Sequence, residues 1–87
     1  MIPSSTVTVT DSSTTLILHL PEGNYVIHTS STNRPSGKAT AATVRQKMRR
    51  GKLVGYVLEA LTYDRGPHPI ASEMFLDIKL VSPAVRA

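Results

Sequence analysis

The feature that most constrains the fold is an alternation of polar and apolar residues near the start of the chain. Residues 5–11, STVTVTD, alternate threonine with valine at a period of two. Successive side chains of a β-strand face opposite sides, so this pattern predicts a half-buried strand. The stretches TTLILHL (14–20) and YVIHTS (25–30) predict a second and a third strand, with turn residues DSS and PEGN between them.

The register of these strands follows from requiring one apolar face. We pair Thr10 with Thr15 across the first turn and Leu20 with Tyr25 across the second. A slip of one residue in either hairpin would send the apolar side chains to the other face, so the pattern specifies the face. The predicted apolar face comprises Val7, Val9, Leu16, Leu18, Leu20, Tyr25 and Ile27.

The next segment, SGKATAATVRQKMRRGK (36–52), predicts an amphipathic helix. Ala41, Val44 and Met48 recur at helical spacing and form a stripe that can pack on the sheet. Arg49 and Arg50 then face away from the sheet. Gly51 is placed to end the helix.

Residues 52–63, KLVGYVLEALTY, fit either a strand or a helix. A strand would place Val54, Tyr56, Leu58 and Ala60 on one face, and a helix would group Leu53, Tyr56, Val57, Ala60 and Leu61. Its glycine, valines and tyrosines favour the strand. Residues 73–82, EMFLDIKLVS, predict a further strand, because Met74, Leu76, Ile78 and Leu80 alternate with Glu73, Phe75, Asp77 and Lys79.

These elements predict an α+β fold of a single small domain, residues 1–87. Its order is β-β-β-α-β-β, a single antiparallel sheet of about five strands with one basic amphipathic helix packed on one face. The chain has no cysteine, which excludes disulfides, thiolate catalysis and cysteine-ligated zinc. No apolar run approaches the roughly 18 residues that a membrane span needs, so we expect a soluble cytoplasmic protein without a membrane partner.

No motif indicates catalysis, a metal or a cofactor, and we expect a protein that is not an enzyme. Gly37 and Lys38 stand before the predicted helix as in a phosphate-binding P-loop, but Ala39 occupies the position where serine or threonine would bind magnesium. His19 and His28 share the polar face of the second hairpin, and a zinc site needs further ligands.

Positive charge is concentrated in one part of the chain. Between Glu22 and Glu59 there is no acidic residue, and seven of the ten lysines and arginines lie there. Such a concentration indicates an anionic partner, most often a phosphate backbone. The candidate nucleic-acid-binding residues are Arg34, Lys38, Arg45, Lys47, Arg49, Arg50 and Lys52.

The leading hypothesis is therefore a non-enzymatic nucleic-acid-binding module, which uses the basic helix and the preceding loop. The chain has one phenylalanine, three tyrosines and no tryptophan, so we expect contacts with the backbone of duplex DNA or structured RNA rather than base stacking. An acidic protein surface is the other partner that this charge would suit.

An apolar outer surface supports a competing hypothesis. The predicted strands would expose together Ile17, Val26, Val57, Leu61, Phe75 and Val81. Such a patch on a small protein marks an interface, and an uncharged first strand at the sheet edge would pair with another chain. The alternative function is an accessory protein of viral, phage or mobile-element type, which binds a host protein or forms a homodimer.

One short stretch resembles a known family. TVRQKMRRGKL, residues 43–53, resembles the second helix and following turn of excisionase-type helix-turn-helix proteins. The resemblance implies a helix that enters the major groove of DNA. The three predicted strands before it depart from that family's pattern, so the family is not assigned.

Overall fold

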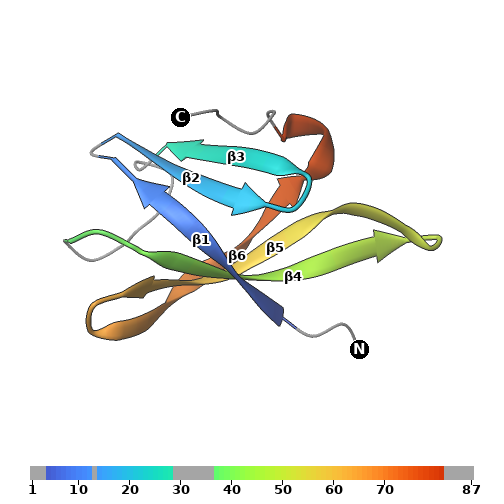
Figure 1. Cartoon of the computed structure of the whole chain (residues 1–87). Coiled ribbons are helices and arrows are strands. Elements are labelled where there is room, and N and C mark those ends of the chain that lie inside the picture. The colour runs from blue at the N-terminus through green and yellow to red at the C-terminus, as the bar shows by residue number, and fades with distance from the viewer. Residues whose placement is uncertain (1–3, 13, 29–36, 82–87) are drawn as a thin grey trace.

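The computed structural model describes residues 4–12, 14–28 and 37–81, and these residues form an antiparallel β-structure (Figure 1). The strands are β1 (Ser4–Asp11), β2 (Thr15–Leu20), β3 (Gly23–His28), β4 (Ala41–Arg49), β5 (Lys52–Tyr63) and β6 (Gly66–Asp77). A 3₁₀ turn, η2 (Ile78–Leu80), follows β6. The described residues contain no helix packed on the sheet, so the α+β prediction is wrong and the fold is nearly all β.

The strands are ordered β3-β2-β1-β4-β5-β6, and every neighbouring pair is antiparallel. The first three strands follow one another, and β4 then returns to lie beside β1. This arrangement is a Greek key. The condition for pairing of the first strand with another chain is not met, because β2 and β4 flank β1 and the edges are β3 and β6.

Strand β1 is divided between two pairings. Its first half, Ser4–Thr8, pairs with β4, whereas Val9–Asp11 pairs with β2. The β2–β3 hairpin consequently crosses over the sheet formed by β4, β5 and β6, and Figure 1 shows these two parts on either side of β1. A strand that passes from one sheet to another makes such a corner.

The β2–β3 register differs from the prediction by two residues. Leu18 rather than Leu20 opposes Tyr25, because only Pro21 and Glu22 form the turn. The β1–β2 register also differs from the prediction by two residues, with Val9 opposite Leu18 rather than Leu16. A shift of two residues keeps every side chain on its face.

The predicted apolar face is therefore confirmed. Four of its members are buried: Leu16, Leu18, Leu20 and Ile27. The other three are partly buried and pack against this core: Val7, Val9 and Tyr25.

The segment predicted as a helix forms β4 and the turn after it. Ala42 and Val44 are buried at a spacing of two residues, while Met48, expected in the core, is 41% exposed. Backbone pairing with β1 on one side and β5 on the other outweighs the helical propensity of this stretch. The resemblance to the excisionase helix fails for the same reason.

Strand β5 confirms the strand interpretation of residues 52–63, with two irregularities in its pairing with β4. Lys47 opposes Gly55 but Met48 opposes Leu53, so Val54 is one extra residue of β5. Thr43 opposes Ala60 but its neighbour Val44 opposes Leu58, so Glu59 is an extra residue in β5. Such a bulge reverses the alternation beyond it. As a result Leu61, predicted to face outward, is fully buried.

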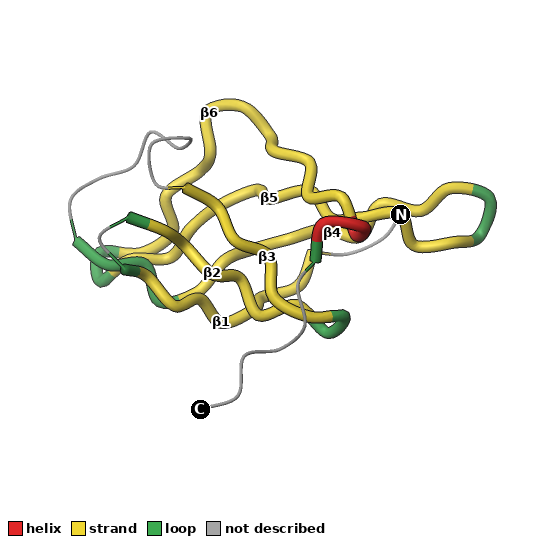
Figure 2. The backbone as a smooth tube through the Cα atoms, turned by 90° about the horizontal axis from the view of Figure 1, so that it is seen from above, coloured by secondary structure: helices red, strands yellow, loops and turns green. Residues whose placement is uncertain are grey.

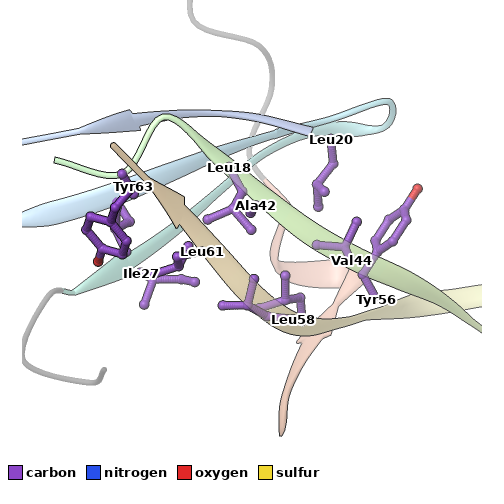
Figure 3. Close-up of a cluster of buried hydrophobic side chains, with 12 residues drawn as sticks. Leu18, Leu20, Ile27, Ala42, Val44, Tyr56, Leu58, Leu61 and Tyr63 are labelled. Atoms are coloured by element: carbon purple, nitrogen blue, oxygen red, sulfur yellow. The ribbon is translucent and has the colours of Figure 1, made fainter. Parts of the chain in front are cut away.

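The core lies between the β2–β3 hairpin and the β4–β5–β6 part of the sheet. Figure 3 shows Tyr56 and Tyr63 at its two ends, with the leucines between them. The largest fully buried side chains are Leu16, Leu18, Leu58, Leu61, Leu76 and Val44. Burial of each such side chain contributes about 1.5–3 kcal/mol, so these six carry much of the hydrophobic stabilisation.

The start of β4 is held by hydrogen bonds from both neighbouring strands. The backbone amide of Ala39 donates to Oδ2 of Asp11 over 2.8 Å. The amide of Thr40 donates to the carbonyl oxygen of Thr62, also over 2.8 Å. These bonds fix where β4 enters the sheet, and hence how far its other end extends.

Candidate nucleic-acid interface

The end of the β4–β5 hairpin extends beyond the rest of the molecule (Figure 2). Gln46, Lys47, Met48 and Arg49 at the end of β4 are all exposed, in contrast to the buried Val44. Residues 46–54 are called the arm below. Its cations are called the tip cations, and they are Lys47, Arg49, Arg50 and Lys52.

The turn of the arm requires an unusual backbone. Arg50 has φ 53° and Gly51 has φ 76°, the positive values that a type I′ hairpin turn needs at both central residues. Gly51 adopts this conformation without a steric penalty, whereas Arg50 has a Cβ atom and does not. The sequence signal at Gly51 was therefore real, but it marks a hairpin turn and not a helix end.

Three of the tip cations share one face of the arm. Arg49 lies directly opposite Lys52, and Lys47 lies opposite Gly55. Residues that oppose each other in an antiparallel ladder lie on the same face, and so do residues two apart in a strand. Lys47, Arg49 and Lys52 therefore form a cluster on the face turned away from the core.

Arg45 belongs to the same face but is engaged within the protein. Its guanidinium forms ion pairs with Glu59 at 3.4 Å and with Glu73 at 3.1 Å. Hydrogen bonds to these two carboxylates raise the pKa of Arg45. A hydrogen bond from the hydroxyl of Ser4, and then that from Arg45, lower the pKa of Glu59. Arg45 thus fastens β4 to β5 and β6.

Arg45 is held by two carboxylates of the protein, whereas the tip cations are not held in this way among the described residues. None of them takes part in an ion pair with a carboxylate in the described part of the chain. Their charges are therefore available to an external anion.

An open groove of about 600 Å³ runs beside the arm. Its cations are Lys47, Arg49, Lys52 and Lys79. Its apolar lining consists of Met48, Leu53, Val54, Phe75 and Ile78. Asp77 is the one carboxylate of the lining, and its Oδ1 accepts a hydrogen bond from the amide of Lys79 over 2.9 Å.

The structure brings only part of the predicted cation set together. Lys38 is exposed at the opposite end of β5, where it lines a second hollow of about 420 Å³ with Arg65 and His68. Tyr63 contributes to this hollow, and its buried hydroxyl has no hydrogen-bond partner. The prediction for Arg34 falls outside the described residues.

Two groove residues, Lys79 and Phe75, are absent from the predicted nucleic-acid set. Phe75 was assigned instead to an apolar interface. The alternation of residues 73–82 already placed both side chains on the outward face. The position of the arm could not be predicted from the sequence. The predicted helix would have placed the tip cations away from Phe75 and Lys79.

The expected apolar interface is not a continuous exposed surface. Leu61 is fully buried and Val57 is 7% exposed, while Val81 packs against the core. Ile17 and Val26 oppose each other on β2 and β3, and Val26 is 46% exposed. Phe75, also 46% exposed, lies on β6 at the other edge strand.

The histidines do not gather into a metal site. His19 hydrogen-bonds to Thr10 at 2.8 Å and to Asn24 at 2.9 Å, and so links three strands. His28 lies at the other end of β3, opposite Thr15. Across the ranges that the structure describes, no three potential metal ligands come together, and no helix is long and apolar enough to cross a membrane.

Comparisons with known proteins give no family for the chain. No protein-family model, no curated protein and no solved structure matches it.

Proposed function

We propose that the protein binds nucleic acid through the arm, with phosphates held by the tip cations. The observation that supports this proposal is the placement of four exposed cations within six residues at the end of one hairpin, without internal ion pairs among the described residues. Neutralised phosphates release their condensed counterions, which drives binding.

The position of the carboxylates strengthens the electrostatic argument. The sequence has no acidic residue between Glu22 and Glu59, so the arm carries no negative charge. Glu59 and Glu73 form ion pairs with Arg45, and Asp77 accepts a hydrogen bond from the backbone amide of Lys79. Lys79 adds a further positive charge to the groove. An anion that approaches the arm thus meets cations with little competing repulsion.

The proposal is tested by fluorescence anisotropy with labelled DNA and RNA over a range of salt concentrations. The double variant Arg49→Asn, Arg50→Asn removes two tip cations. We expect the slope of log K against log salt to fall by about 1.4–1.8, since each lost phosphate contact removes about 0.7–0.9.

The matched control is the double variant Lys38→Asn, Arg65→Asn, which removes the same charge at the opposite end of β5. We expect it to lower the slope by less than half as much. Equal effects of the two variants would mean that only net charge matters, and no binding at low salt would refute the proposed function itself.

A further inference from the structure

The groove beside the arm contains an aromatic ring in an unusual setting. Phe75 is the only phenylalanine of the chain, and it is 46% exposed. Tyr56 and Tyr63, in contrast, are buried at the ends of the core. A half-exposed phenylalanine contributes little to the core, because much of its apolar area remains in water.

The position of this ring is set by a glycine. Phe75 opposes Val57 in the sheet, and its ring reaches over Gly55. A Cβ atom on Gly55 would lie 2.6 Å from Cε1 and 2.7 Å from Cζ of Phe75. The ring therefore occupies the space that a side chain at residue 55 would fill, and the strand backbone supports it from below.

The same ring lies in a groove with more cations than carboxylates. Lys47 on β4 and Asp77 on β6 lie opposite Gly55, and Asp77 accepts a hydrogen bond from the amide of Lys79. The other cations of the groove are Arg49, Lys52 and Lys79. An apolar ring supported on one side, in a groove lined by four cations and one carboxylate, matches the chemistry of a nucleotide. A base stacks on the ring, and its neighbouring phosphates meet the cations. An apolar peptide would leave these charges without partners.

We propose that the groove beside the arm binds an unpaired base, which stacks on Phe75. The protein would then bind single-stranded nucleic acid in preference to duplex. This inference rests on the proposed function. Within a duplex the faces of the bases stack on one another, and an aromatic side chain reaches them only in unpaired segments. The ring is held against the sheet, so it cannot act as a wedge between base pairs. The composition of the sequence favoured duplex or structured RNA, and the position of Phe75 reverses that preference.

The test compares Phe75→Leu with the wild-type protein on oligonucleotides of about 12 nucleotides, a length within the usual site size of a single-strand binding groove. Leucine keeps an apolar side chain but has no ring for a base to stack on. We expect single-strand binding to weaken by about 5- to 160-fold, the range that loss of one stacked base produces. Binding of a duplex of the same length should change by less than about twofold, because phosphate contacts alone hold it.

A second variant reads the stacking directly. The chain has no tryptophan, so Phe75→Trp introduces a single fluorescent reporter. We expect single strands to quench its emission and duplex to leave it nearly unchanged. Circular dichroism confirms in both variants that the fold is intact.

The outcomes separate the two proposals. Tip-cation-dependent binding with equal affinity for single strands and duplex, unaffected by Phe75→Leu, would overturn the stacking inference and keep the proposed function. Absence of binding to any nucleic acid would overturn both.

Discussion

The turn of the arm allows the fold and the proposed interface to be tested with one substitution, Arg50→Asn. Arg50 is the one residue other than glycine with a positive φ in the described ranges. A left-handed backbone costs a residue with an ordinary side chain roughly 1–2 kcal/mol, and asparagine tolerates it far better. The substitution also creates Asn-Gly, the pair that type I′ turns prefer.

We expect Arg50→Asn to raise the free energy of unfolding by about 0.5–1 kcal/mol, which corresponds to an increase in Tm of about 2–8 °C for a domain of this size. Urea unfolding followed by circular dichroism measures the change, with an unchanged m value as evidence that the unfolding transition is the same. At the same time one tip cation is lost, so the slope of log K against log salt should fall by about 0.7–0.9. A variant that is more stable yet binds more weakly cannot owe its weaker binding to misfolding.

The control is Arg49→Asn, which removes the same charge from the neighbouring residue. Arg49 lies in β4 without a positive φ, so asparagine brings no conformational gain there and is a poorer strand residue. We expect a stability equal to or below that of the wild-type protein. If Arg50→Asn is no more stable than Arg49→Asn, Arg50 does not adopt the positive φ of a type I′ turn.

Three further predictions concern the parts of the fold that position the arm. Asp11→Ala removes the acceptor for the Ala39 amide and should lower the free energy of unfolding by about 1–3 kcal/mol in urea, whereas no loss would mean that this bond does not hold the start of β4. Burial, and then the hydrogen bond of 2.5 Å to Glu22, raise the pKa of Tyr56 to about 12. The pKa of Tyr56 in the unfolded chain is about 10, so the contribution of its protonated hydroxyl to the free energy of unfolding is complete below pH 10. This contribution falls by up to about 2 kcal/mol as the pH rises through 12. Urea titrations of Tyr56→Phe at increasing pH should lack this part of the decline. Gly55→Ala would place a Cβ atom 2.3 Å from a backbone carbonyl oxygen of β6, and we expect a loss of about 1–3 kcal/mol in thermal unfolding, with a neutral effect contradicting the close approach.

The first three strands could be predicted from sequence because apolar residues recur at every second position in each of them. Their turns leave the register uncertain by two residues, yet an even shift preserves the face, so the buried set was predicted correctly although the pairing was not. The face is encoded by the strand itself, whereas the register depends on how many residues the turn uses.

The segment that became β4 could not be assigned in this way. Val44 and Met48 belong both to a helical stripe with Ala41 and to a period-two set with Ala42. Local sequence does not separate these alternatives, and the decision comes from β1 and β5, which lie far from it in the chain or were themselves ambiguous.

The candidate site could not be assembled from the sequence because the choice between helix and strand for β4 was open. Its cations were identified from charge alone, but their grouping with Phe75 depends on a hairpin that places β4 on one side of β5, with β6 on the other. The bulge at Glu59 is a further feature without a local signal, and that one residue decides that Leu61 faces inward.

The division of β1 between β2 and β4 has a consequence for how the protein opens. Separation of the β2–β3 hairpin, or of the β4–β5–β6 sheet, would in either case remove one of the two partners of this strand. Neither part can therefore open without disturbing the other, and the whole domain should behave as one cooperative unit. Amide hydrogens in the middle of β1 should accordingly exchange with solvent only through global unfolding, while those at the end of the arm exchange much faster through local fraying.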